Sequence, residues 1–169
     1  MKPALLVIDV QKAFFKNPEA KKSLDQAMEY IESALELFRE NKRPVVFLQH
    51  KDESDGLVPG TEDFDLPDAF KVQPDDLRIT KTHGNAFVQT SLEKDLRSMG
   101  VDTVIITGFC AEWCVLSTTR GAVDIKMNPI ILRGSIASPS SENIRFVESI
   151  SEVISYGALE TFLKALPTK

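Results

Sequence analysis

Apolar residues along the chain form short continuous runs that alternate with longer stretches of helical periodicity. Residues 4–8 are all apolar and end at Asp9, a pattern typical of a strand covered on both faces of a parallel sheet. From about Glu19 to Glu40, apolar positions recur every three or four residues. This spacing predicts an amphipathic helix with a charged outer face. Polar residues and a proline end the helix, and a second strand is expected over residues 44–49.

The alternation continues to the C-terminus. Further strands are predicted at 103–107, 129–132 and 153–155, and further helices at 90–99, 115–122, 141–151 and 157–166. This order predicts one α/β domain over residues 1–169, with a mostly parallel central sheet of about six strands and helices on both faces, in three layers. The exception is Lys51–Gln73, a stretch rich in Asp, Gly and Pro. A loop of that length in a compact domain is either functional or disordered.

Composition and charge exclude some classes of binding partner. Acidic residues outnumber basic ones by 25 to 20, giving a net charge of -5, so no basic excess exists to attract nucleic acid. No apolar run approaches the roughly 20 residues that a membrane helix needs. The N-terminus shows no cleavage site of the secretory type, so we expect a cytoplasmic protein that binds neither membrane nor nucleic acid.

Polar residues that could take part in catalysis or ligand binding follow the predicted strands. Ligands of parallel α/β sheets bind beyond the carboxyl ends of the strands. Four segments lie just past a predicted strand, namely Asp9, Gln49-His50, Lys81 and the loop 108–114. We therefore expect these segments to gather at one edge of the sheet.

The chain has two cysteines, Cys110 and Cys114, and the second is predicted to begin a helix. Free backbone N–H groups at a helix N-terminus stabilise a thiolate, which makes Cys114 a candidate nucleophile with a lowered pKa. Two alternatives stay open at this point. Both cysteines could be small buried apolar groups, or they could form a CxxxC redox pair.

Asp9 and Lys81 are candidates for supporting roles. Asp9 could act as the general base that takes the thiol proton, or it could cap a turn at the end of its strand. Lys81 could orient Asp9 and balance its charge, or it could be a solvated surface charge.

The two histidines, His50 and His83, allow several interpretations. Either could be a base for the cysteine, a metal ligand, or a histidine whose polar atoms are simply satisfied. Candidate partners in a metal site are the loop acids Asp52, Asp55 and Asp63. However, the chain has no His-x-His, HExxH or glycine-rich phosphate motif, so the third interpretation is preferred.

Three ordered motifs carry a family resemblance. They are the strand segment Leu6–Phe15 with Asp9, the segment of Lys81 followed by Asn85-Ala86-Phe87, and the cysteine segment from Ile105 to Ala122. Together they resemble the isochorismatase-like cysteine hydrolases, a superfamily that includes nicotinamidases and N-carbamoylsarcosine amidases. The loop Leu57–Glu62 also resembles a Pro-Gly-Thr loop of the subgroup that lacks obvious metal ligands.

The resemblance implies an Asp9–Lys81–Cys114 triad that hydrolyses a non-peptide C–N bond, an amide or carbamoyl group of a small molecule, through a thioester. It also implies a cis peptide bond between Phe109 and Cys110, and an oxyanion hole formed by the backbone N–H groups of Cys110 and Cys114. Because the isochorismate-cleaving branch does not need the cysteine, Cys114 favours amidase chemistry.

The chain also departs from the family pattern. Gln49-His50-Lys51-Asp52 replaces the Asp-x-His segment of metal-dependent nicotinamidases, so we expect no metal and no cofactor. Ala111-Glu112-Trp113 replaces the usual residues before the nucleophile. We expect Phe14, His50 and Trp113 to contact the substrate, and the resemblance implies a homo-oligomer, either a dimer or a tetramer. The alternatives are a catalytically inactive family member that serves as an oligomeric binding or scaffold protein, and a redox-responsive protein.

Overall fold

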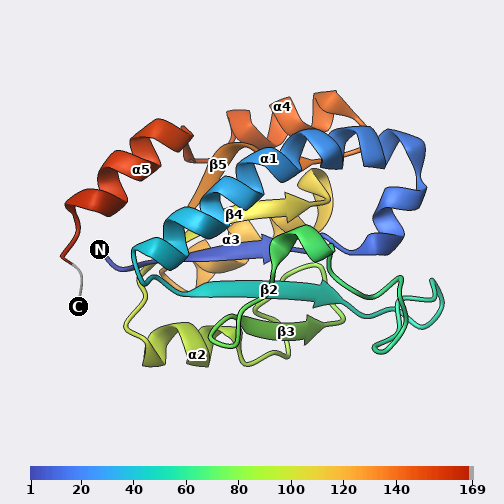
Figure 1. The fold of residues 1–169 in the computed structure, drawn as a ribbon, viewed down its shortest axis with the longest axis horizontal. Helices are drawn as coiled ribbons and strands as arrows, with labels where there is room; N and C mark the ends of the chain where they lie inside the picture. Colours follow the sequence, from blue (N-terminus) through green and yellow to red (C-terminus); the bar gives the residue numbers. More distant parts are fainter. Residues whose placement is uncertain (168–169) are drawn as a thin grey trace.

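The computed structural model describes residues 1–167, within which six parallel strands form one sheet in the order β3-β2-β1-β4-β5-β6 (Figure 1). The strands are β1 (Pro3–Ile8), β2 (Val45–His50), β3 (Leu77–Lys81), β4 (Thr103–Phe109), β5 (Asn128–Ala137) and β6 (Val153–Ile154). All neighbouring strands run parallel, which confirms the predicted sheet. The single domain predicted over 1–169 stays a prediction, and residues 168–169 lie outside the described residues.

Helices cover both faces of this sheet, which confirms the three-layer architecture. Across residues 1–167 the α-helices are α1 (Pro18–Glu40), α2 (Leu92–Ser98), α3 (Leu116–Asp124), α4 (Ser141–Ser149) and α5 (Tyr156–Ala165). Helices α1 and α5 pack with Leu5 and Val7 of β1 on one face, whereas α2, α3 and α4 pack with Leu6 and Ile8 on the other. No helix within this range is long and apolar enough to cross a membrane.

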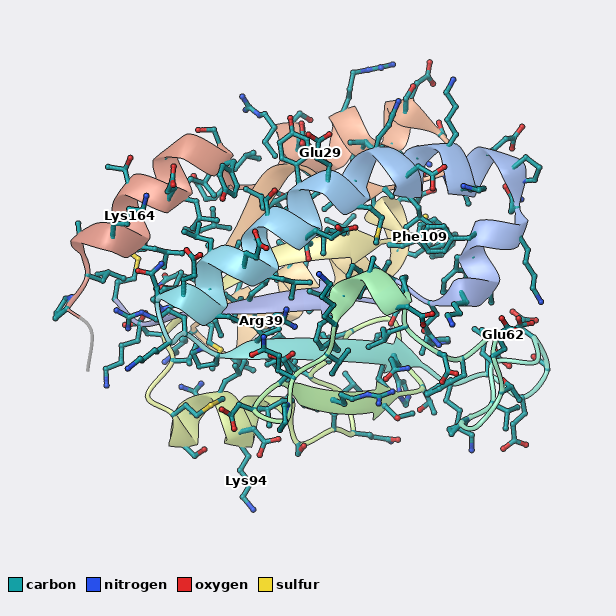
Figure 2. The ribbon with its side chains drawn as sticks, viewed as in Figure 1. Glu29, Arg39, Glu62, Lys94, Phe109 and Lys164 are labelled. Atoms are coloured by element: carbon teal, nitrogen blue, oxygen red, sulfur yellow. The ribbon has the colours of Figure 1, made fainter. Side chains whose placement is uncertain are left out.

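Local sequence explains the first helix. The Asn17 side chain accepts hydrogen bonds from the backbone N–H groups of Glu19 and Ala20, and Pro18 begins α1. The predicted apolar stripe, which includes Leu24 and Ile31, is buried. Charged side chains such as Glu29 on α1, Lys94 on α2 and Lys164 on α5 point away from the sheet (Figure 2).

Two segments differ from the sequence prediction. Strand β5 runs to Ala137, beyond the predicted 129–132, because the sequence Arg133-Gly134-Ser135 interrupts the apolar run without ending the strand. The loop 51–73 contains an isolated bridge between Asp52 and Leu57 and the short helical turn η2 (Asp68–Phe70). Two more short helical turns follow strands, η1 (Lys12–Lys16) after β1 and η3 (Ala111–Val115) after β4.

The topology places a switch point between β1 and β4. The chain builds outward from β1 to β3, then returns to add β4 on the other side of β1. Ligands of open α/β sheets bind at such a point, beyond the carboxyl ends of the strands. Gly108 of β4 pairs with Ile8 of β1 there, at a φ of 119° that L side chains rarely adopt. A Cβ at Gly108 would overlap the Ile8 backbone.

We expect Gly108→Ala to lower the free energy of unfolding by at least about 3 kcal/mol, because the methyl group combines backbone strain with a clash that neither rigid strand can relieve. Urea unfolding followed by circular dichroism measures this loss. The control is Gly157→Ala in α5, where an added Cβ meets nothing within 4 Å. Equal stability of the two variants would contradict the close approach of β4 to β1 at Gly108.

Candidate active site

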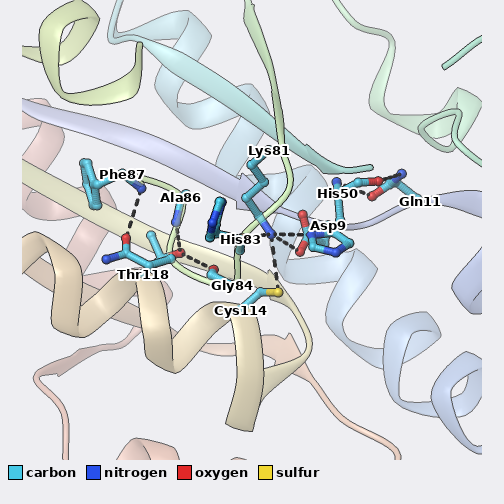
Figure 3. Close-up of polar contacts among 11 residues, drawn as sticks. Asp9, Gln11, His50, Lys81, His83, Gly84, Ala86, Phe87, Cys114 and Thr118 are labelled. Atoms are coloured by element: carbon cyan, nitrogen blue, oxygen red, sulfur yellow. Dashed lines mark hydrogen bonds and ion pairs between the residues drawn. The ribbon is translucent and has the colours of Figure 1, made fainter. Parts of the chain in front are cut away.

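The structure brings together the three predicted catalytic side chains at the carboxyl edge of the sheet (Figure 3). Asp9 directly follows β1, Lys81 is the last residue of β3, and Cys114 lies in η3 after β4. The Lys81 Nζ atom lies 2.7 Å from Asp9 Oδ2 and 3.3 Å from Cys114 Sγ. Because β2 lies between β3 and β1, the lysine side chain crosses the end of β2 to reach Asp9.

Lys81 is the centre of this cluster. Its side chain is fully buried and forms an ion pair with Asp9, whose side chain is only 3% exposed. The same Nζ atom lies 3.2 Å from His50 Nδ1 and 3.1 Å from the His83 carbonyl oxygen, to which it donates. The lysine is therefore a buried, paired charge, and the solvated-surface interpretation is wrong.

The two oxygens of the Asp9 carboxylate differ in their hydrogen bonds. Oδ2 accepts from Lys81, whereas Oδ1 is buried and has no hydrogen-bond partner within residues 1–167. Asp9 has a φ of 50°, a left-handed conformation that costs a non-glycine residue about 1–3 kcal/mol. Ligand-type atoms of Asp9, His50 and Cys114 lie within 4.8 Å of one another. A carboxylate oxygen of Asp9 is thus close enough to the Cys114 thiol to interact with it.

Burial sets the protonation of this pair. Burial raises the pKa of Asp9, and the Lys81 charge opposes the shift. Burial and the nearby Asp9 charge raise the pKa of the Cys114 thiol to about 12, again against Lys81. The prediction of a lowered thiol pKa is therefore wrong. Cys114 lies inside η3 and does not begin a helix, and burial with an adjacent carboxylate outweighs the lysine.

The segment before Cys114 is held by Glu112. The Phe109–Cys110 peptide bond is cis, as the resemblance implied. Cys110 Sγ donates to Glu112 Oε2 at 3.0 Å, while Glu112 Oε1 accepts from Ser138 Oγ at 3.0 Å and Asn143 Nδ2 at 2.6 Å. These bonds tie η3 to α4 and to the residue that follows β5. Both cysteines are free thiols in the described structure, so the redox pair stays an untested alternative.

A buried hydroxyl on α3 joins the segment after Lys81 to the segment that carries Cys114. Thr118 Oγ1, on α3, accepts from the Ala86 N–H at 3.1 Å and donates to the Gly84 carbonyl at 3.3 Å (Figure 3). Thr118 lies one helical turn after Cys114, so the loop that follows Lys81 is fixed against the segment that carries the thiol.

The predicted substrate contacts occupy different positions. His50 is half-buried beside Lys81, and its backbone N–H and carbonyl are both held by the Gln11 side chain. Phe14, on η1, packs against Phe109 with ring centroids 4.8 Å apart. Trp113 is adjacent to Cys114 in the chain and 70% exposed. Whether these three side chains touch substrate stays a prediction.

Sequence reasoning missed two contacts of Lys81, the His50 ring and the His83 carbonyl. The signal for His50 was its place at the end of the second predicted strand, next to the strand that precedes Asp9. The His83 ring itself lies by the Thr82 hydroxyl, at 3.2 Å. The contact with the His83 carbonyl could not be predicted from the sequence, because every residue type has a backbone carbonyl.

The side chains near Lys81 are poorly suited to bind a metal ion. Within residues 1–167, Asp9, His50 and Cys114 are the one group of His, Cys, Asp and Glu residues that could hold a metal ion. The loop acids Asp52, Asp55 and Asp63 do not join it. The Lys81 ammonium already contacts an atom of each member, at 2.7, 3.2 and 3.3 Å. A metal cation there would face an adjacent buried positive charge, so we derive no catalytic step through a metal.

A cavity of about 410 Å³ lies elsewhere, lined by residues at the amino ends of the strands and near the described C-terminus, among them Met1, Arg43 and Pro167. None of the predicted site residues lines it. Because chemistry needs reactive groups, the cluster around Lys81 is the better candidate for the active site.

Fold and site together define a three-layer α/β protein with a buried Asp–Lys–Cys cluster at its topological switch point. The family model for the isochorismatase domain matches residues 3–149. The chain therefore belongs to the isochorismatase family.

Individual relatives agree with this assignment. The isochorismatase family protein YrdC of Bacillus subtilis (strain 168) is 33% identical over 139 residues, which cover 81% of this chain and 74% of YrdC. The cysteine hydrolase of Pseudomonas syringae pv. phaseolicola 1448A shares the fold, with a TM-score of 0.88 at 23% identity over 97% of this chain and 93% of that chain. The nicotinamidase/pyrazinamidase PncA of Bacillus subtilis has a TM-score of 0.78 at 26% identity, over 90% and 99% respectively.

Proposed function

We propose that this protein is a cysteine hydrolase that cleaves a non-peptide C–N bond, an amide or carbamoyl group, of a small molecule. One observation carries the proposal. A single buried ammonium, that of Lys81, contacts both Asp9 and Cys114, and a carboxylate oxygen of Asp9 lies within 4.8 Å of the Cys114 sulfur. A nucleophile, a base and an orienting charge within contact distance are the parts that covalent acyl transfer requires.

The first half-reaction forms a thioester. Asp9 Oδ1 accepts the thiol proton as Cys114 Sγ attacks the carbonyl carbon of the substrate. The backbone N–H groups of Cys110 and Cys114 would donate to the resulting oxyanion. Collapse of this intermediate breaks the C–N bond, and Asp9 returns its proton to the departing nitrogen. Ammonia or an amine leaves.

The second half-reaction restores the enzyme. Asp9 takes a proton from water, and the resulting hydroxide attacks the thioester carbonyl. The C–S bond breaks, the acid or carbamate product leaves, and the proton held by Asp9 returns to the sulfur. The raised pKa of Asp9 suits it to this shuttle, because a base that is less acidic than an ordinary aspartate takes a proton more readily.

The substrate class rests on similarity. The solved neighbour from Bacillus subtilis is named for hydrolysis of nicotinamide and pyrazinamide, both small aromatic amides. In this chain Trp113, the exposed residue next to Cys114, provides aromatic surface, and Phe14 and Phe109 form an aromatic pair that packs with Cys110. We infer that Phe14, His50 and Trp113 contact the substrate.

The direct test is a screen of small amides and carbamoyl compounds that measures ammonia release by the purified protein. We expect turnover of at least one compound, without added metal and unaffected by a chelator. If the protein hydrolyses none of a chemically broad panel, the proposed activity is wrong and the binding or scaffold alternative takes its place.

We further propose that the protein works in the cytoplasm as a homo-oligomer. Free cysteines suit a reducing compartment. Exposed apolar side chains such as Trp113, Val123 and Phe146 are typical of surfaces that a second copy covers. Sedimentation velocity at several concentrations should give a dimer or tetramer, and a monomer throughout would contradict the assembly.

The pH dependence of activity follows from Asp9. This carboxyl must be ionised to accept the thiol proton, and burial raises its pKa above the usual 3.8. As the pH falls, kcat/KM should therefore decline at a higher pH than an ordinary aspartate would produce. A pH–rate profile measures the acid limb, and circular dichroism at each pH controls for unfolding. Full activity down to the usual pKa of aspartate would contradict this role of Asp9.

A further inference from the structure

The Lys81 ammonium has more hydrogen-bond acceptors than hydrogens. Its four neighbours are Asp9 Oδ2 at 2.7 Å, the His83 carbonyl at 3.1 Å, His50 Nδ1 at 3.2 Å and Cys114 Sγ at 3.3 Å. An ammonium carries three N–H donors, so one acceptor is always left without a proton. The Asp9 carboxylate is the strongest acceptor because it is charged, and the His83 carbonyl is fixed in place by the backbone. The His50 ring and the Cys114 sulfur therefore compete for the third N–H.

The His50 ring is suited to accept. Burial and the Lys81 charge lower the pKa of His50, against the opposing charges of Asp9, Asp52 and Asp55. The imidazole is thus neutral at physiological pH, and its Nδ1 has a lone pair directed at the lysine. Its proton then resides on Nε2.

The sulfur changes as an acceptor during the reaction. At rest the thiol is protonated, since burial and Asp9 raise its pKa to about 12, and a neutral sulfur is a weak acceptor. Once Asp9 Oδ1 takes the proton, the sulfur carries a negative charge and attracts an N–H donor far more strongly. Rotation of the ammonium about its Cε–Nζ bond can transfer the third N–H between the two acceptors without any proton leaving the nitrogen.

We propose that His50 is a positioning residue, which binds the third N–H of Lys81 in the resting enzyme and releases it to Cys114 when the thiol loses its proton. The inference rests on the proposed function, because it takes Cys114 as the nucleophile. Its consequence is that His50 adds to the preference for the protonated thiol at rest, because it binds the N–H that would otherwise stabilise the thiolate. The charged groups that act on the sulfur are Asp9 and Lys81, while the His83 ring faces the Thr82 hydroxyl.

The test measures alkylation of Cys114 by iodoacetamide as a function of pH. A Cys110→Ser background leaves Cys114 as the one thiol, since the chain has two cysteines. His50→Leu removes the acceptor and keeps the bulk, whereas His50→Asn retains an oxygen that can take the place of Nδ1. Below the thiol pKa the alkylation rate is proportional to the thiolate fraction, so variants should give parallel lines of log rate against pH.

We expect alkylation of His50→Leu to be about three- to tenfold faster than wild type at every pH, a shift of up to about one pKa unit. His50→Asn should match wild type. His83→Leu is the matched control for loosening of the site, because it keeps the backbone carbonyl that Lys81 uses, and it too should match wild type. If His50→Leu reacts no faster than His50→Asn, or if His83→Leu accelerates equally, the proposal is wrong.

A second measurement needs no variant. Nitrogen-15 NMR of the wild-type protein should show His50 Nδ1 without a proton at neutral pH, and a protonated Nδ1 would overturn the proposal even if His50→Leu failed to fold. Neither readout requires a substrate. An amidase without the alkylation shift contradicts the role of His50 alone, whereas the shift in a protein that hydrolyses no amide contradicts the proposed function alone.

Discussion

Replacement of Cys114 by alanine should abolish hydrolysis, with a loss of at least about 10³-fold in kcat, because the residues of a nucleophilic unit act together and removal of the nucleophile removes the covalent route. Asp9 and Lys81 would remain paired but would have no sulfur to activate. The measurement is ammonia release from the best substrate of the screen, with the wild-type protein assayed in parallel.

Two controls make this result specific. The thermal unfolding of Cys114→Ala should match that of wild type, since the change removes one half-buried sulfur atom. Cys114→Ser should also be severely impaired despite its similar size, because a hydroxyl is a far weaker nucleophile than a thiolate. Substantial turnover by Cys114→Ala would show that bond cleavage does not pass through a thioester.

Replacement of Lys81 by methionine should abolish activity and also destabilise the fold. The methionine fills a similar volume but leaves the buried Asp9 carboxylate without its partner, and breaking a buried ion pair costs about 3–5 kcal/mol. We expect this loss in the free energy of urea unfolding at neutral pH. The loss should shrink in acid, where Asp9 becomes protonated and its buried charge disappears.

The double variant Asp9→Asn/Lys81→Met separates the two effects. With both charges removed, the free energy of unfolding should recover most of the loss, since no unpaired buried charge remains. Activity should not recover, because neither base nor orienting charge is restored. A double variant as unstable as Lys81→Met alone would show that the lysine stabilises the fold through its packing, and not through Asp9.

The order of helices and strands was predictable because it follows from local patterns of apolar residues. Helix α1 follows directly from the apolar spacing of residues such as Leu24 and Ile31, and β1 from an unbroken apolar run. The rule that parallel strands present their carboxyl ends at one edge directed attention to Asp9, Lys81 and the loop 108–114. The resemblance to the family motifs then predicted that these positions form one site.

The protonation of the site was not predictable. The pKa of Cys114 depends on burial and on the distance to Asp9, a residue more than a hundred positions earlier, and neither can be read from the local sequence. The same holds for the His50–Lys81 contact, which joins the ends of adjacent strands. Strand β5 was underestimated because polar residues interrupt its apolar run while it continues in the sheet.

The pairing of β1 with β4 also bears on how the site comes into being. Thr107 of β4 donates to the carbonyl of Leu6 across 101 positions of the chain, and the Lys81–Asp9 ion pair spans 72. Contacts between such distant segments form slowly, because closing a long loop costs entropy before it gains contacts. No fragment that ends before β4 can hold Cys114 beside Asp9 and Lys81. During synthesis, the Cys114 thiol therefore acquires its partners only after most of the polypeptide has emerged and β4 has docked.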